Sequence, residues 1–182
     1  MTLNDIIVSA LAQLDRAHDM QTVEIYRERF ARFANDAQFD LALTLALKRT
    51  EEVEPVDGVV DLGKLSRHCY RVESAEQLGR KVPFRIGDSP EQLFLPYNET
   101  ARLTYRFSPA KLESAADVSE LPEAVHPLIV SYVVGRERMG GDVSTQGGGN
   151  IYLSMYNAAK AKLRGSLGYC CGDPYTITNR YE

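Results

Sequence analysis

The longest run of patterned hydrophobic positions spans residues 121–163. Apolar side chains recur there at the i, i+3, i+4 spacing of one helix face, first before and then after a run of glycines. The first stripe consists of Val125, Leu128, Ile129, Tyr132, Val133 and Arg136, and the second of Tyr152, Met155, Tyr156, Ala159 and Leu163. Asn150 is suited to cap the second helix and Gly165 to end it. The pattern predicts two amphipathic helices joined by a glycine-rich loop.

Two further helices are predicted at the start of the chain. Thr2, with Asp5 three residues later, is a short form of the capping box. The apolar face that follows consists of Leu3, Ile6, Ile7, Ala10, Leu11 and Leu14. From Thr22, a second cap, a longer helix carries a wide apolar face that continues to Leu47. Because the connector between them is short, we expect these two helices to pack antiparallel.

The hydrophobic period changes from 3.6 to about 2 after Asp57 and Gly58. We interpret the acidic stretch 51–54 as the solvated end of the helical region. The β-prone segments that follow, separated by turn residues, are VVDL, HCYRVE, VPFRI, QLFL and ARLTYRF. In the last segment Ala101, Leu103, Tyr105 and Phe107 share one face, and Arg102, Thr104 and Arg106 share the other. This alternation predicts an antiparallel meander with one wet face.

These elements predict an α+β fold, with an antiparallel bundle of about four helices, an inserted antiparallel β-meander and an extended C-terminal tail. Residues 1–52 and 109–165 would form the bundle, 53–108 the β subdomain and 166–182 the tail. The tail has no helical period and few charges, which is not typical of a solvated, disordered end. Its large side chains include Tyr169, Tyr175, Ile177 and Tyr181. We expect it to dock on the chain's own sheet or on the edge of a partner.

Composition and charge narrow the function. A chain of 182 residues with 44% hydrophobic content can bury a core without disulfides. Its net charge of -4 argues against a surface whose main task is to bind phosphate backbones. The β region is nevertheless locally basic, and Arg102 and Arg106 are candidates to face a DNA channel or an acidic protein ring. A solvated sheet face is the plainer alternative.

No catalytic, cofactor or metal motif is present in the sequence. His18, His68 and His126 are scattered, and the adjacent pair Cys170 and Cys171 lacks the ligand count of a metal site. The glycines at 147–149 suggest an anion site at a helix start, but no strand precedes them and no Lys-Ser/Thr follows, which favours a flexible loop. The interrupted amino-terminal apolar run predicts neither a signal peptide nor a membrane span. We expect a protein that is not an enzyme.

The order of these parts resembles the head-to-tail connector (adaptor) proteins of tailed bacteriophages. The similarity covers nearly the whole chain. It rests on the opening helix pair, the insertion closing in RLTYRFSP, the segment ELPEAVHPLIVSYVVGRERMGGDV, and a last helix ending YNAAKAKL. The resemblance implies a structural protein of the virion neck, made in the host cytoplasm, that assembles as a homo-oligomeric, twelve-fold ring beneath the portal.

Such a ring would extend the DNA channel and dock the next neck or tail component, with DNA passing non-specifically and no membrane involved. The resemblance implies that the tail reaches the portal protein, and its large side chains Tyr169, Tyr175, Ile177 and Tyr181 are candidate anchors on the portal or on a neighbouring subunit. Two alternatives stay open: a tail-completion or tail-terminator ring protein, and a small ligand-binding module with a pocket in the β insertion. The face of the ring that the insertion occupies is also open.

Overall fold

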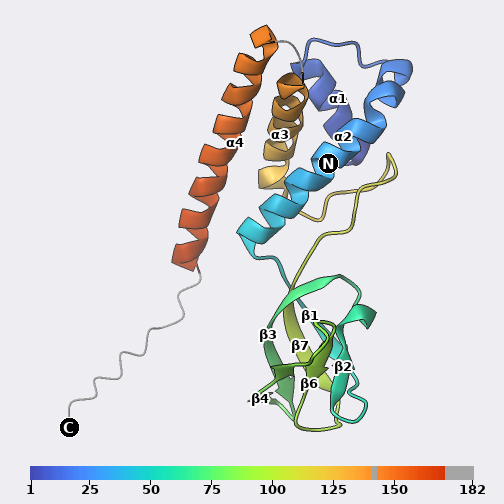
Figure 1. Cartoon of the computed structure of the whole chain (residues 1–182), viewed down its shortest axis with the longest axis vertical. Helices are drawn as coiled ribbons and strands as arrows, with labels where there is room; N and C mark the ends of the chain where they lie inside the picture. The colour runs from blue at the N-terminus through green and yellow to red at the C-terminus, as the bar shows by residue number, and fades with distance from the viewer. Residues whose placement is uncertain (141–142, 171–182) are drawn as a thin grey trace, which may run out of the picture.

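A computed structural model of the chain describes residues 1–140 and 143–170, and of residues 143–145 and 164–170 it describes the backbone alone. Helices form a bundle at one end, and small antiparallel sheets form a β subdomain at the other (Figure 1). The chain enters the β subdomain after its second helix and returns to the bundle before its third. The predicted α+β class, with strands inserted between helices, is thereby confirmed.

The first two helices are α1 (Leu3–Gln13) and α2 (Met20–Leu45). The capping box of α1 is present as predicted, because Thr2 accepts the Asp5 amide and Asp5 accepts the Thr2 amide. Helix α2 begins earlier than predicted, since the carboxylate of Asp19 caps it by accepting the amide of Thr22 at 3.2 Å. It ends where Ala46 adopts a left-handed backbone with φ of 51°.

The last two helices are α3 (His126–Met139), preceded by the short helix η2 (Glu123–Val125), and α4 (Val143–Cys170). Pro127 lies in the first turn of α3, where its missing amide proton costs nothing, so it starts the helix and does not kink it. Helix α4 runs alongside α3 (Figure 1). It begins before the predicted cap at Asn150 and continues past the predicted stop at Gly165.

The glycine run is therefore helical, which corrects the prediction of a flexible loop. Glycine at an interior helix position costs about 1 kcal/mol relative to alanine, so packing must compensate. Gly149 supplies the reason: a Cβ there would lie 3.0 Å from the carbonyl oxygen of Gly135 and 3.0 Å from the amide of Met139. A Cβ on Gly135 would lie 2.9 Å from Leu153 Cγ. The two glycines allow the α3 and α4 backbones to approach closely.

The β subdomain consists of two antiparallel sheets. One has the order β1-β7-β3-β4 and contains β1 (Lys48–Val53), β3 (Cys69–Gln77), β4 (Arg80–Val82) and β7 (Ala101–Phe107). The other has the order β2-β6-β5 and contains β2 (Val59–Asp61), β5 (Arg85–Ile86) and β6 (Gln92–Phe94). The short helix η1 (Leu62–Lys64) follows β2. Because the first strand pairs with the last, the strands do not follow one another as in a simple meander.

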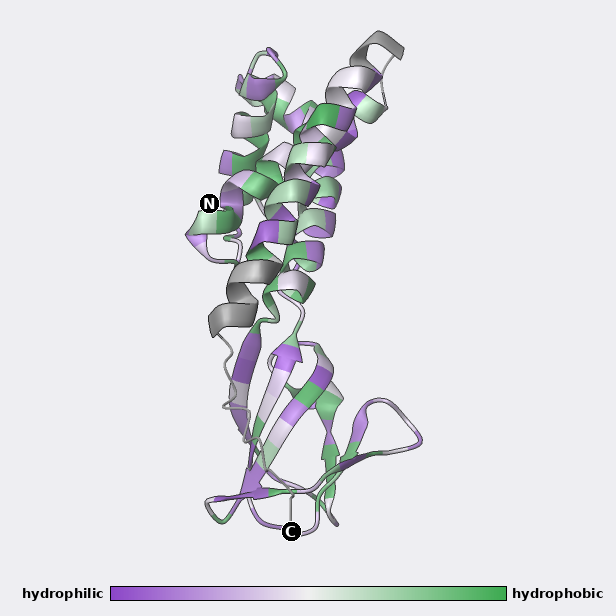
Figure 2. Ribbon diagram, turned by 90° about the vertical axis from the view of Figure 1, so that its left-hand side faces the viewer, coloured by the Kyte–Doolittle hydropathy of each residue, from purple (hydrophilic) through white to green (hydrophobic). Residues whose placement is uncertain are grey.

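Strand β1 was not predicted, and its residues 48–52 fall in the range assigned to the bundle. The side chains of the acidic stretch, which suggested a solvated helix end, point alternately to the two faces of β1. Glu51 points inward, whereas Glu52 lies on the outer face and pairs with Arg102 in the strand register. On β7 the predicted inner face is confirmed, since Ala101, Leu103 and Tyr105 are fully buried. In Figure 2 the four-stranded sheet carries many hydrophilic residues, as a sheet with one wet face should.

Each region has its own hydrophobic core. The bundle core is contributed by α1, α2, α3 and the 108–121 connector, with Tyr156 added from α4. The smaller β core lies between the two sheets and consists of Val60, Leu62, Val72, Ala75, Leu93, Leu95, Ala101 and Leu103. Two separate cores leave the junction between the regions to be held by other contacts.

Polar contacts hold the junction. Arg67, just before β3, donates from Nε to both carboxylate oxygens of Glu120, at 2.9 and 3.2 Å. The connector is fixed to α2 by two amide side chains: Asn35 exchanges two hydrogen bonds with the Leu112 backbone, and the buried Gln38 donates to the Ala110 carbonyl. The connector is thus anchored to α2 and to the β subdomain by side-chain hydrogen bonds.

Candidate functional site

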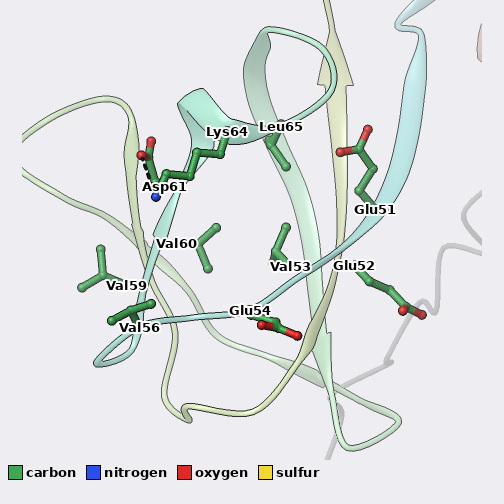
Figure 3. A pocket seen from close by; sticks show the side chains of 10 residues that line it. All are labelled: Glu51, Glu52, Val53, Glu54, Val56, Val59, Val60, Asp61, Lys64 and Leu65. Carbon is green, nitrogen blue, oxygen red and sulfur yellow. Dashed lines mark ion pairs between the residues drawn. The ribbon is translucent and has the colours of Figure 1, made fainter.

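A pocket of about 390 Å³ lies between β1 and β2. Both strands are at the end of their sheet orders, so each presents one edge that pairs with no strand among the described residues. We call this pocket the β1–β2 cup. Its apolar members are Val53, Val56, Val59, Val60 and Leu65, and its charged members are Glu51, Glu52, Glu54, Asp61 and Lys64. Figure 3 shows Val53, Val60 and Leu65 towards the centre of the cup, Val56 and Val59 at one side, and the Glu52 side chain pointing away from the centre.

The cup carries excess negative charge. Its lining has four carboxylates and one lysine, and Lys64 Nζ lies 3.8 Å from Asp61 Oδ2 (Figure 3). Two other cations lie beside the lining: Arg49 is 2.8 Å from Glu51, and Arg102 is opposite Glu52 in the strand register. Glu52 and Glu54 are exposed on the strand edge. An apolar floor with an acidic rim is suited to a ligand group that is apolar at its tip and positively charged at its base.

Glu51 occupies the side of the cup nearest the bundle. Its Oε1 accepts a hydrogen bond from the hydroxyl of the buried Tyr105 at 2.8 Å, and Ser66 donates to the carboxylate from both its amide and its hydroxyl. Burial opposes ionisation, but the hydrogen bonds from Ser66 and Tyr105 and the charge of Arg49 outweigh it, and the pKa of Glu51 lies below its ordinary value. Glu51 is therefore a fixed, charged anchor for the loop after η1 and not a proton donor.

The outward face of the four-stranded sheet contains Arg102 and Arg106, the candidates for channel-facing cations. Arg106 forms an ion pair with Glu73, which also lies 3.7 Å from both Lys48 and Arg71. The register places Arg102 between Glu52 on β1 and Glu76 on β3. Burial of Glu73 is outweighed by these cations, so the pKa of its carboxyl is lowered. The face therefore alternates in charge and is not uniformly basic.

Besides the β1–β2 cup, the outer surface of α4 also exposes apolar side chains. One side of the helix packs on α3 and α2, where the Tyr156 hydroxyl donates to Asp40 at 2.6 Å and Lys160 pairs with the same carboxylate. On the opposite side Ile151 and Met155, one turn apart, are 63% and 61% exposed. Apolar side chains exposed together on one helix face indicate a contact surface.

The candidate tail residues lie largely beyond what the structure describes. Tyr169 falls within α4, so the predicted tail loses its first five residues, 166–170, to that helix, whose regular backbone hydrogen bonding continues to Cys170. The side chains of Tyr169 and Cys170 are outside the described residues, as are Tyr175, Ile177, Tyr181 and Cys171. Their role in partner binding stays a prediction.

No protein-family model matches this chain, and no curated protein sequence matches it significantly.

The described part of the chain contains no group of three or more His, Cys, Asp or Glu side chains placed to hold a metal ion. No helix among the described residues is long and apolar enough to cross a membrane. Of the three histidines, only His126 is buried. Its Nε2 lies 2.9 Å from the Leu121 carbonyl oxygen, and its Nδ1 lies 3.1 Å from the amino group of Met1. These contacts tie the start of α3 to the start of the chain.

Sequence reasoning missed the β1–β2 cup. The cup is formed where the loop 54–58 turns the chain away from β1, so its floor combines residues that show no common period. The acidic residues 51–54 were the available signal, but a run of charges is usually a solvated surface. Only the pairing of β1 with β7 shows that alternate residues of this run face inward.

Proposed function

We propose that this chain is a structural protein of a bacteriophage virion: a head-to-tail adaptor that forms a ring beneath the portal, extends the DNA channel and docks the next neck or tail component. The observation that carries the proposal is the order of parts. A helix pair, an inserted β subdomain, a third helix and a long last helix follow one another along the chain, in the order that the resemblance to adaptor proteins implies.

The surfaces of the subunit support assembly into a ring. Head-to-tail contacts around a closed ring join two different patches of the same protein, so each subunit needs two unlike surfaces. The outer face of α4, with Ile151 and Met155, is one such surface. The β1–β2 cup is another, of different shape and charge.

The charge pattern of the sheet is compatible with passage of DNA. Proteins that hold DNA tightly neutralise many phosphates with lysine and arginine. Here Arg106 is already paired with Glu73, and Arg102 lies between two glutamates in the register. If this face lines the channel, the alternating charge would let DNA slide without being retained. The portal or neighbour contacts of Tyr169, Tyr175, Ile177 and Tyr181 belong to the same proposal.

The test is the copy number of this chain in intact particles. Virions from the source would be purified and digested, and labelled standard peptides would give the ratio of this chain to the portal protein by mass spectrometry. The proposal predicts equal copies. A chain absent from finished particles would overturn it. A chain present in copies that do not match the portal, and located at the tail end by labelling, would instead favour the tail-completion role.

A further inference from the structure

The tip of the β3–β4 hairpin exposes an apolar side chain close in sequence to two cations. Its turn consists of Leu78 and Gly79, and the strand that follows begins with Arg80 and Lys81. Leu78 is 69% exposed, although leucine is usually buried. Neither Arg80 nor Lys81 forms an ion pair within the described part of the chain. We call residues 77–81 the β3–β4 tip.

The backbone of the tip is strained at Leu78. Its φ is +53°, in the left-handed region that favours glycine and asparagine. A leucine there costs about 1 kcal/mol, while the next residue, Gly79, has φ +71° at no such cost. Both residues fit a tight hairpin turn in which Asn-Gly would be the ordinary choice. A bulky apolar residue that is both strained and exposed indicates a use outside the isolated subunit.

Besides the exposure and the backbone strain of Leu78, a buried polar atom without a partner lies at the base of the tip. The side chain of Gln77 is buried, and its amide nitrogen donates to the carbonyls of Tyr97 and Glu99 at 2.9 and 2.8 Å. Its Oε1 is also buried but has no hydrogen-bond partner among the described residues. An unpaired buried amide oxygen costs about 1–3 kcal/mol. Gln77, Arg80 and Tyr97 line a hollow of about 500 Å³ beside the tip.

The β3–β4 tip and the β1–β2 cup are complementary in chemistry. The tip presents one apolar side chain next to two positive charges. The cup offers a floor of four valines and a leucine beneath four carboxylates and one lysine. Desolvating Leu78 against this floor would bury apolar surface on both sides, including the Val56 side chain, which is 72% exposed. Arg80 and Lys81 would then approach the exposed carboxylates of Glu52 and Glu54.

The two features cannot meet within one subunit. In the four-stranded sheet β1 and β4 are opposite edges, separated by β7 and β3. Figure 1 likewise shows β4 and β2 on opposite sides of the β subdomain. A donor on one edge and an acceptor on the other give a heterologous, head-to-tail contact, which closes into a ring when the rotation between copies permits.

We propose that the β3–β4 tip of one copy inserts Leu78 into the β1–β2 cup of the next copy, with Arg80 and Lys81 against its acidic rim. This inference deepens the proposed ring assembly and rests on it. The contact joins β subdomains, so the subdomain serves as the connection between neighbouring subunits.

The first test is a charge exchange between copies. In the tip variant Arg80→Glu/Lys81→Glu, both the tip and the cup are acidic. In the cup variant Glu52→Lys/Glu54→Lys, both the tip and the cup are basic. Each alone should associate at least about tenfold more weakly than the unmodified chain by sedimentation velocity, because like charges then meet. An equimolar mixture should restore association, since every contact in an alternating assembly again pairs opposite charges. The control Arg32→Glu/Lys111→Glu, on α2 and the connector, changes the net charge equally but leaves tip and cup intact, so it should associate as the unmodified chain does.

The second test maps the contact directly. A photoreactive residue at position 78 of one copy would be irradiated with an isotopically labelled second copy of the full chain, at concentrations up to about 1 mM so that weak contacts are populated. Cross-links to residues 51–65 of the labelled copy are expected. Cross-links elsewhere, no cross-links, or failure of the mixture to restore association would overturn the contact.

The failure of this contact is distinguishable from the failure of the adaptor role. Portal-matched copies in virions without tip-to-cup cross-links would leave the adaptor role standing and remove this contact. Tip-to-cup cross-links in a chain that is absent from virions would support this contact and reject the adaptor role.

Discussion

The helical bundle and the β subdomain differ in the size of their cores and in the groups that they expose. The bundle core combines buried stripes of α1, α2 and α3 with Tyr156 of α4, and within it Phe30, Ile129 and Val133 are each fully buried. The β subdomain has a core of eight residues, and several of its strands are only two or three residues long. Its remaining side chains form a charged face, an open cup and a strained tip.

The difference shows where stability and contact surface are concentrated. A core as large as that of the bundle can hold a fold by itself, whereas a small, two-sheet core gains less from burial. The β subdomain is therefore free to expose edges and apolar groups that an isolated protein would avoid. The junction contacts, such as Arg67 with Glu120, fix the position of one region relative to the other.

The largest expected effect is a loss of stability when the bundle core is emptied. Phe30→Ala removes a fully buried aromatic ring between α2 and its neighbours and should lower the free energy of unfolding by about 3–5 kcal/mol. Urea denaturation followed by circular dichroism measures this. Met20→Ala, at a side chain that is 88% exposed, is the matched control and should change little. A loss of less than about 1 kcal/mol for Phe30→Ala would show that the bundle core is not the main source of stability.

A smaller effect is expected where α3 and α4 cross. Gly149→Ala places a Cβ 3.0 Å from backbone atoms of α3, which would have to shift, and the net loss should be about 1–3 kcal/mol. Gly147→Ala is the control two residues away, where a Cβ meets nothing within 4 Å. It should stabilise the helix by up to about 1 kcal/mol. Equal effects of the two substitutions in urea denaturation would contradict close packing at Gly149.

Removing one hydroxyl within the β subdomain should have a modest effect. Tyr105→Phe deletes the hydrogen bond to Glu51 and leaves a partly buried carboxylate with one donor fewer, at a cost of about 1–2 kcal/mol. The substitution should also increase hydrogen exchange of the loop around Ser66, which Glu51 holds. Tyr97→Phe, at an exposed ring, is the control. Unchanged exchange around Ser66 would show that Glu51 does not depend on Tyr105.

Stability is expected to fall with decreasing pH in two separate ranges, one set by a buried histidine and one by carboxylates. Burial and the nearby amino terminus lower the pKa of His126 below 6.5, so the unfolded chain binds this proton first and stability falls as the pH drops below 6.5. The pKa values of Glu51, Glu73 and Glu120 lie below 4.5, so their contribution is lost only as the pH falls below 4.5 and through those lower values. Urea titrations at a series of pH values measure both ranges.

Two substitutions would assign the two ranges. His126→Gln should flatten the loss that begins at pH 6.5 and leave the acid range unchanged. Glu73→Gln should reduce the acid loss alone. If His126→Gln changed the acid range or Glu73→Gln changed the range that begins at pH 6.5, the assignment of the two ranges to these groups would be wrong.

The sequence predicted the elements whose local signals agree with their packing. The capping box at Thr2 and the alternation along β7 both matched the structure. The sequence did not predict the segments whose conformation depends on residues far away along the chain. Gly149 is helical because Gly135 lies against it, and residues 48–53 form a strand because β7 pairs with them. Leu78 next to Gly79 was a readable anomaly in a hairpin turn, but the cup that complements it is visible only once β1 and β2 are placed.

The central claim is that the β subdomain connects neighbouring copies while the bundle maintains the fold. Electron cryomicroscopy of the neck in purified virions, at a resolution that shows side chains, tests it most directly. The account predicts a ring in which the β3–β4 tip of each copy lies in the β1–β2 cup of the next, with Leu78 against the valines. A ring whose copies touch only through their helices, with tip and cup both in solvent, would contradict it.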